Sequence, residues 1–503
     1  MREPFGGVSE THSAVVFFAG DRAYKLKKPV RLGFLDFSTV EARALACARE
    51  TELNRRFAPD VYLGVAEVRD AAGQVCDHLV IMRRMPASRR LSSLIQAGVD
   101  AGPALREIAR LLGAQHAAAE RSALISEQGS RDATRRRWRD NIEQLRAVSG
   151  DLIDAAEIDE AAALADRFLA GRAALFDARM RAGRVIDGHG DLLAGDIFCL
   201  DDGPRVLDCL DFDDRLRWLD GLDDAAFLAM DLEHLGAPGL AEQFTRWYGE
   251  YSGDHAPSSL QQHFVAYRAI VRAKVRCLRA HEGDLNAAGE ARGLAAATVR
   301  HLRAGAVTLV LVGGLPGTGK SALAGEIASR LGFTVLSSDR IRKELAGIAP
   351  GQHAAEEFGA GLYAPAWTDR TYAELISRAA ELLAMGESVV LDATWSAPDH
   401  RESAAALARQ AAAELVQLEC TAPAQVAASR IDRRPDEVSD ATPAIAARLT
   451  AEHAPWPEAL AIDTSSEFSQ DDPSGAIQSA LTAIRPHGPE YVWRPVRPYM
   501  LPG

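Results

Sequence analysis

The apolar positions in the first part of the chain fall into short runs separated by turn signals. Residues 14–27 predict two strands that meet at Gly20-Asp21, a dipeptide typical of a tight hairpin. A helical pattern follows over residues 39–57, and a second pair of strands is predicted at 61–68 and 75–82. This order predicts a small antiparallel sheet with one helix.

The spacing becomes helical in the middle of the chain. From about residue 88 to 182 apolar residues recur every three or four positions, which predicts a series of helices. A short β-rich stretch interrupts this pattern over residues 185–208, and helices resume to about residue 304. We place a domain boundary at Arg303-Ala-Gly305.

The last part of the chain alternates strands with helices. The strands are predicted at residues 308–313, 333–337, 388–393, 414–420 and about 460–463. This alternation is typical of a doubly wound parallel sheet. The Pro-rich residues 486–503 are predicted to form a tail that lies on the surface of one domain.

Composition excludes several classes of protein. The net charge of −13 gives no overall field that would attract nucleic acid or a membrane surface, so a nucleic-acid partner is not favoured, although a local basic groove stays an open alternative. The six cysteines show no CxxC spacing, so a disulfide framework or a zinc site is not expected. The sequence has no signal-peptide pattern and no run long enough to span a bilayer. We therefore expect a soluble cytoplasmic protein.

Lysine is rare in this chain, since only six of its 57 basic residues are lysines. Lys320 belongs to Gly314-Leu-Pro-Gly-Thr-Gly-Lys-Ser321, a complete phosphate-binding loop between a predicted strand and a predicted helix. The expected ATP ligands are Gly314, Pro316, Gly317, Thr318, Gly319, Lys320 and Ser321. Backbone N–H groups would surround the β-phosphate, Lys320 would bridge β and γ oxygens, and the Ser321 hydroxyl would bind Mg²⁺.

Two aspartates follow predicted strands of the same domain. Asp339 comes after the second strand, where an open α/β sheet binds its ligands. Asp392 ends the apolar run Val389-Val-Leu-Asp392, the position that holds Mg²⁺ directly or through water. In the alternative interpretation Asp339 only caps a helix that starts at Arg340, and Asp392 only caps a turn.

The segment Asp339-Arg-Ile-Arg342 resembles the Asp-x-x-Arg motif of the polynucleotide kinase, zeta-toxin and small-metabolite kinase group. The resemblance implies that Asp339 takes the proton of the acceptor hydroxyl and that Arg342 holds the acceptor or a phosphate. Ser429-Arg-Ile-Asp-Arg-Arg-Pro-Asp436 resembles the arginine-bearing lid of these kinases, with Arg430, Arg433 or Arg434 near the transferred phosphoryl group. Alternatively, this charged run is a solvated helix face.

His189-Gly-Asp191 with Asp196 five residues after Asp191 resembles the catalytic loop of the aminoglycoside phosphotransferase family. The resemblance covers about residues 1–300 and implies a protein-kinase-like bilobal fold with its hinge at Met82 to Met85. It assigns Asp191 as the base or acceptor-orienting group, Asp196 and Asp208 as Mg²⁺ ligands, and Lys25 with Glu50 as the pair that positions the ATP phosphates. Asp196 replaces the usual Asn, and the nearest match to a Gly-rich loop is only Thr11-His-Ser13.

The acceptor is expected to differ from an aminoglycoside, which is a polycation. Arg268, Arg272 and Arg276 lie at i, i+4 and i+8 of a predicted helix and share one face. If this face lines the cleft, the acceptor is an anionic metabolite. Alternatively, these arginines only pair with the Asp-rich stretch between Asp208 and Asp231.

The fold class expected is therefore α/β and α+β. An aminoglycoside phosphotransferase-like domain (1–304, small lobe 1–85 and helical large lobe 86–304) precedes a P-loop kinase domain (305–485) and the tail (486–503). The expected function is ATP- and Mg²⁺-dependent phosphoryl transfer to the hydroxyl group of a small metabolite, with two nucleotide sites. Two alternatives stay open: polynucleotide 5′-kinase activity in the second domain, or a nucleotide-gated regulatory protein whose first domain is degenerate.

Overall fold

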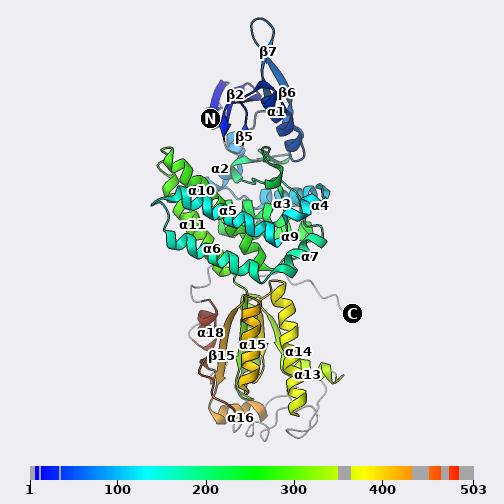
Figure 1. The fold of residues 1–503 in the computed structure, drawn as a ribbon, viewed down its shortest axis with the longest axis vertical. Coiled ribbons are helices and arrows are strands. Elements are labelled where there is room, and N and C mark those ends of the chain that lie inside the picture. The colour runs from blue at the N-terminus through cyan, green and yellow to red at the C-terminus, as the bar shows by residue number, and fades with distance from the viewer. Residues whose placement is uncertain are drawn as a thin grey trace. The chain divides into compact units, whose positions relative to one another are not determined.

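The computed structural model describes residues 6–10, 13–32, 35–348, 364–432, 453–465 and 475–485 (Figure 1). Its contacts divide the chain into two compact units. The first unit contains Met1–Ile153, Phe176–Ala256 and Phe264–Thr298, and the second contains Asp154–Leu175, Pro257–His263 and Val299–Gly503. Each unit carries one of the expected nucleotide sites.

A five-stranded antiparallel sheet begins the first unit, with strand order β1-β2-β3-β7-β6 (Figure 1). The strands are β1 (Gly6–Glu10), β2 (Ala14–Ala19), β3 (Arg22–Lys27), β6 (Tyr62–Arg69) and β7 (Val75–Arg83), with a short pair β4 (Arg31–Leu32) and β5 (Leu35–Asp36) beside them. Helix α1 (Val40–Arg55) packs on this sheet and buries Cys47 against Ala23 and Val80. The predicted sheet with one helix is present, but β1 was not predicted because its five residues are all exposed and show no apolar alternation.

Helices form most of the middle of the chain, as predicted. They are α2 (Leu91–Gln96), α3 (Gly102–Ala118), α4 (Ala123–Gln128), α5 (Arg131–Ser149), α6 (Ala155–Ala170), α7 (Ala173–Arg181), α8 (Gly221–His234), α9 (Pro238–Ser252), α10 (Ser258–His281) and α11 (Ala287–Ala304). The predicted β-rich stretch consists of β8 (Val185–Asp187), β9 (Ile197–Leu200) and β10 (Gly203–Val206), and β11 (Trp218–Asp220) pairs with β8.

The second unit is built on a parallel sheet with strand order β13-β14-β12-β15-β16. The strands are β12 (Thr308–Gly313), β13 (Thr334–Ser337), β14 (Val389–Asp392), β15 (Glu414–Thr421) and β16 (Leu460–Asp463). Helices α12 (Lys320–Leu331) and α18 (Ala476–Ile484) contact it on one side, and α14 (Pro365–Ala384) and α15 (Pro398–Gln410) cover the other side (Figure 1). The doubly wound sheet predicted from the sequence is confirmed.

Chain reversals at the ends of this sheet rely on glycine. Gly332 follows α12 with a φ of 73° and its N–H donates to the Ala328 carbonyl, which closes the helix with a left-handed residue. Gly386 follows α14 with a φ of 85°. These two turns lead into β13 and β14. The central strand β12 is buried at every position, as expected for a strand covered on both faces.

The boundaries predicted at residues 304 and 485 stay predictions. Contacts place α6 and the start of α10 with the parallel sheet, although both precede residue 304 in the chain. The predicted tail, residues 486–503, lies outside the described residues. Within the described part of the chain, none of the helices combines the length and the apolar character needed to cross a membrane.

We expect Ile327→Ala to lower the free energy of unfolding of the second unit by about 2–5 kcal/mol, because Ile327 is fully buried between α12 and the sheet and its loss leaves a cavity. Leu460→Ala, at a half-exposed position of the edge strand β16, is the control and should cost less than about 1 kcal/mol. Denaturant unfolding of the full chain measures both. Equal effects of the two substitutions would contradict the assigned core.

Candidate functional sites

Lys25 lies at the centre of the candidate site in the first unit. Its Nζ is 2.8 Å from Glu50 Oε1 and 2.9 Å from Asp208 Oδ1. Burial alone would lower the pKa of Lys25, but Asp208 and Glu50 raise it well above its usual value. The lysine is therefore a fixed cation between two carboxylates that come from distant parts of the sequence, an arrangement suited to holding phosphate oxygens.

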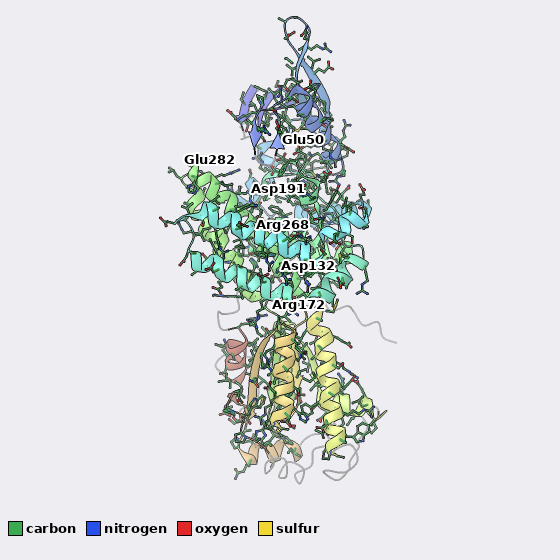
Figure 2. All side chains as sticks on the ribbon, viewed as in Figure 1. Glu50, Asp132, Arg172, Asp191, Arg268 and Glu282 are labelled. Carbon is green, nitrogen blue, oxygen red and sulfur yellow. The ribbon has the colours of Figure 1, made fainter. Side chains whose placement is uncertain are left out.

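Glu50 forms ion pairs with two lysines of β3, Lys25 and Lys27. It is 1% exposed in α1 (labelled in Figure 2), and its second carboxylate oxygen lies 2.9 Å from Lys27 Nζ. Burial would raise the pKa of Glu50, but Lys25 and Lys27 together lower it. Lys27 also donates to Asp211 at 2.8 Å. The alternation of β3 could have indicated this role, since Lys25 and Lys27 are two residues apart and share one face of the strand.

Asp224 orients the loop that carries Asp191. The N–H groups of His189 and Gly190 donate to its two carboxylate oxygens at 2.7 and 2.9 Å, and His116 Nε2 lies 3.1 Å away. Burial would raise the pKa of Asp224, but its hydrogen bond with His116 helps to lower it. A β-carbon at Gly188 would lie 2.5 Å from this carboxylate, so only glycine fits there. This role of Asp224 was not predicted from the sequence, although Asp224 belongs to the Asp-rich stretch between Asp208 and Asp231.

His189 stabilises the loop that carries Asp191. It is fully buried, and its Nε2 donates to the Leu207 carbonyl at 3.1 Å. Burial lowers the pKa of His189 to about 4, so the ring is neutral at physiological pH. The resulting hydrogen bond ties the Asp191 loop to the strand end that precedes Asp208.

Asp191, Asp196 and Asp208, the three aspartates that the resemblance assigns to this site, lie close enough for their charges to affect one another's pKa values. Burial raises the pKa of Asp191 to about 6, while Arg272 opposes that rise. Burial, followed by the charge of Asp208, raises the pKa of Asp196 to about 7. Asp208 itself has a φ of 64° and an exposed side chain, and Lys25 lowers its pKa. The structure thus brings together all five residues assigned to this site.

Asp196 and Asp208 suit a divalent cation. Their mutual repulsion would be relieved by a bound cation, and Mg²⁺ commonly uses one or two protein carboxylates together with phosphate oxygens and water. Among the described residues there is no group of three or more His, Cys, Asp or Glu side chains that could hold a metal ion. Two carboxylates beside Lys25 fit a metal that arrives with ATP.

The arginines of α10 have different partners. Arg268 Nε donates to Asp223 at 2.7 Å, and both side chains are buried, so the pairing alternative is confirmed for this residue. Arg276 lies 2.8 Å from Glu290. Arg272 makes no hydrogen bond or ion pair with the described residues, and it is the strongest charge acting on Asp191. Figure 2 labels Asp191 and Arg268 in this region.

The phosphate-binding loop of the second unit connects β12 to α12. Gly314, Gly317 and Gly319 have φ angles of 128°, 81° and 87°, which other residues rarely adopt. Lys320 Nζ donates to the Leu315 carbonyl at 3.2 Å and so lies back over the loop. The expected order of strand, loop and helix is present, with the loop N–H groups at a helix N-terminus.

Ser321 and Asp392 meet at the mouth of this loop. Ser321 Oγ donates to Asp392 Oδ2 at 2.7 Å, although the residues are 71 positions apart. The parallel pairing of β12 with β14 places Asp392 beside Val312, at the strand end next to the loop. A hydroxyl and a carboxylate in contact here fit the two protein ligands expected for Mg²⁺.

Asp339 and Arg342 lie on α13 (Ser338–Leu345), which starts directly after β13. The helix begins at Ser338 with Ser337 as its N-cap, so the alternative that Asp339 caps a helix starting at Arg340 is wrong. Burial raises the pKa of Tyr372, and Arg342 and Asp339 both act on it, in opposite directions. The Tyr372 hydroxyl is 3.2 Å from Thr394 Oγ1, two residues after Asp392. Both motif residues are therefore at the carboxyl edge of the sheet.

Arg430 lies on α16 (Ala424–Asp432), the helix that begins the expected lid. This helix packs against the loop, because a β-carbon on Gly317 would lie 2.4 Å from the Ala427 carbonyl oxygen. Arg430 Nη2 donates to the Thr464 carbonyl at 2.7 Å. The structure places Arg430 beside the loop, whereas Arg433 and Arg434 lie outside the described residues. Thr464, whose hydroxyl donates to the Thr318 carbonyl, was not predicted.

Comparisons with known proteins agree with this architecture. A model for an AAA domain matches residues 309–455. The uncharacterized protein Rv2004c of Mycobacterium tuberculosis is 46% identical over 470 residues, which cover 92% of this chain and 93% of that protein. An uncharacterized protein of Mycobacterium bovis matches to the same extent.

Solved kinases resemble the chain only distantly. A choline kinase from Cryptosporidium parvum is 10% identical and covers 60% of this chain and 90% of its own, with a TM-score of 0.39. A sugar kinase from Janibacter is 18% identical and covers 35% of this chain and 94% of its own, with a TM-score of 0.26. Likenesses of this size carry no argument about substrate.

The P-loop domain predicted from the sequence is confirmed by the parallel sheet of the second unit and by the AAA-domain match. The antiparallel sheet and the helices predicted for the first unit are also present. The general class, an ATP-dependent phosphotransferase, is supported by that match and by the geometry of both sites. The extent of the mycobacterial match shows the family of the whole chain. The chain belongs to the same family as Rv2004c of Mycobacterium tuberculosis.

Proposed function

We propose that the chain is an ATP- and Mg²⁺-dependent phosphotransferase with a working nucleotide site in each unit, and that its acceptors are hydroxyl groups of small metabolites. The observation that carries the proposal is Lys25, fixed between Glu50 and Asp208 at 2.8 and 2.9 Å. Lys25 thus contacts both the carboxylate of α1 and the aspartate that the resemblance assigns to Mg²⁺, which is the arrangement that a working nucleotide site requires. The first unit therefore has the charges required for catalysis as well as the kinase-like fold.

In the first unit, Lys25 holds the ATP phosphates and Glu50 holds Lys25. Asp196 and Asp208 would hold Mg²⁺, and the bound ion would supply positive charge beside the transferred phosphoryl group. Asp191 orients the acceptor hydroxyl and takes its proton. Its pKa of about 6 leaves it ionised at physiological pH but more basic than an ordinary carboxylate.

In the second unit, the loop N–H groups and Lys320 hold the phosphates. Ser321 and Asp392 provide the Mg²⁺ ligands, and Asp339 is the base on the neighbouring helix. Arg342 holds the acceptor or a phosphate, while Arg430 and Arg434 close over the nucleotide. Catalysis at both sites depends on positioning and charge stabilisation, as is general for phosphoryl transfer.

The acceptor of the first unit is anionic. Arg272 acts on Asp191 more strongly than any other charge, and no described residue neutralises it by direct contact. A cation at the acceptor side would repel a polycationic substrate and attract a phosphate or carboxylate group. A sugar phosphate or a hydroxy acid has the required combination of a hydroxyl group and a negative charge.

Separate variants test whether both sites turn over ATP. We expect Lys25→Ala and Lys320→Ala each to lower the rate of one acceptor-dependent activity by about 100-fold or more, because each removes a cation that faces the transferred phosphate. ATP consumption in a screen of sugars, sugar phosphates, nucleosides and oligonucleotides is the measurement. Lys28→Ala is the control on the same segment, because Lys28 pairs only with the exposed Glu10 among the described residues.

The pattern of losses separates the alternatives. If Lys320→Ala alone lowers turnover, the first unit is regulatory and the proposal of two working sites is wrong. If an oligonucleotide 5′ end is the acceptor that Lys320→Ala silences, the second unit is a polynucleotide kinase. If neither variant lowers turnover, the chain is not a kinase.

We expect Asp191→Asn to remove the activity of the first unit but to increase its stability by about 1–3 kcal/mol above pH 7. Burial raises the pKa of Asp191 to about 6 from its ordinary value of 3.8, so ionisation is costly in the folded state. Below about pH 4 the carboxyl is protonated in both states, and the gain should disappear. Denaturant unfolding at pH 4 and pH 7.5 provides the test, and a stability gain that does not change with pH would refute it.

Arg272→Gln should raise KM for an anionic acceptor about tenfold or more and change kcat less, because Arg272 binds the acceptor charge and takes no proton. Arg279→Gln, which removes a charge from an exposed position of the same helix, is the matched control. Steady-state kinetics with the best acceptor of the screen gives both constants. An unchanged KM in the Arg272 variant would show that the acceptor charge is bound elsewhere.

A further inference from the structure

A small hollow, with ≈ 20 Å³ of space for the centres of water-sized groups, lies in the second unit where the end of α6 meets the start of β12 and β15. Its walls are partly apolar, with Leu164, Phe168 and Val307, and partly charged. The charged and titratable residues that line it are Arg167, Arg172, His263 and Glu414. None of these residues belongs to either nucleotide site.

Arg172 is the unusual member of this group, because it is 0% exposed and faces no carboxylate among the described residues. Its Nη1 donates to the carbonyl oxygens of Gly171 and Ala411 at 2.8 and 2.9 Å. Its Nε and Nη2 have no hydrogen-bond partner in the described part of the chain. Burying a guanidinium without an anion is costly, so these two donors indicate a missing negative partner.

Nε and Nη2 form one edge of the guanidinium, and this edge fits two oxygens of a carboxylate or phosphate. The first unit shows the same edge in use. Arg179 binds Asp220 through Nε at 2.7 Å and Nη2 at 2.6 Å, and Arg217 binds Asp187 through the same atoms at 2.9 and 3.2 Å. Arg172 thus presents the edge that holds an oxyanion elsewhere in this chain.

The charge of the hollow is positive. Arg167 lies 3.2 Å from Glu414, so these two compensate each other and leave Arg172 as the excess charge. Burial, together with Arg167, lowers the pKa of Arg172 to about 10, which still leaves it protonated at physiological pH. His263 stacks on Phe168 with ring centroids 4.4 Å apart.

The hollow is remote from the phosphate-binding loop. Val307 and Glu414 stand at the amino edge of the parallel sheet, whereas the loop leaves its carboxyl edge after Gly313. The six residues of β12 separate these edges by about 20 Å, at roughly 3.3 Å per residue. Figure 2 shows Arg172 beside the amino edge. An anion at Arg172 is therefore not part of the ATP that binds to the loop.

We propose that this hollow binds a small oxyanion, a carboxylate or a phosphate, through the Nε and Nη2 edge of Arg172. The bound anion neutralises the buried guanidinium and completes its hydrogen bonds. It also connects the end of α6 to the turn between α15 and β15, where Ala411 accepts from Arg172 and Ala412 has a φ of 47°.

Binding is tested in the full chain with Lys25→Ala and Lys320→Ala combined, so that neither nucleotide site contributes. Inorganic phosphate and sodium acetate are the probes, each compared with sodium chloride at equal ionic strength by calorimetric titration and thermal unfolding. We expect one or both oxyanions to bind saturably and to raise the melting temperature. Binding of phosphate alone would assign a phosphate ligand, whereas binding of acetate would assign a carboxylate.

Three further substitutions in that background locate the site. Arg172→Met and Arg172→Lys should each raise the dissociation constant by about tenfold or more, because both lack the edge with two nitrogen donors. The lysine variant keeps the positive charge, so it still tests the site if the methionine variant does not fold. Arg330→Gln, which removes one charge from the partly exposed surface of α12, should leave binding unchanged. The proposal is overturned if no oxyanion binds beyond the chloride control, or if Arg172→Lys binds as tightly as its parent.

Discussion

The buried carboxylate of Glu50 is the constraint on which the candidate site of the first unit depends. A carboxylate that is 1% exposed must be paired, and Glu50 meets this requirement with Lys25 and Lys27, at 2.8 and 2.9 Å. This fixes the position of β3 against α1 and directs Lys25 towards Asp208. The position of the phosphate-binding cation is therefore a consequence of how the small sheet folds.

Backbone geometry has the corresponding role in the second unit. Three left-handed glycines shape the loop after β12, and parallel strand pairing places Asp392 against Ser321. The two units therefore reach similar chemistry by different means. One relies on a buried ion pair between a strand and a helix, and the other relies on N–H groups at a helix N-terminus.

Local patterns predicted much of this arrangement. The loop from Gly314 to Ser321 carries its own geometry, and alternating strands and helices predict the parallel sheet. Residues that act through distant contacts escaped prediction. Asp224 is recognisable only once its bonds to His189 and Gly190 are seen, and Thr464 only once β16 lies beside the loop. Strand β1 escaped because pairing with β2, and not apolar burial, holds it.

The central claim is that one chain holds two independent ATP sites, and the binding stoichiometry tests it most directly. Equilibrium dialysis of ATP with Mg²⁺ should give two nucleotides per chain for the unaltered protein. It should give one for Lys25→Ala, one for Lys320→Ala and none for the double variant. The account would be contradicted if the unaltered protein bound one ATP per chain and the Lys25→Ala variant also bound one.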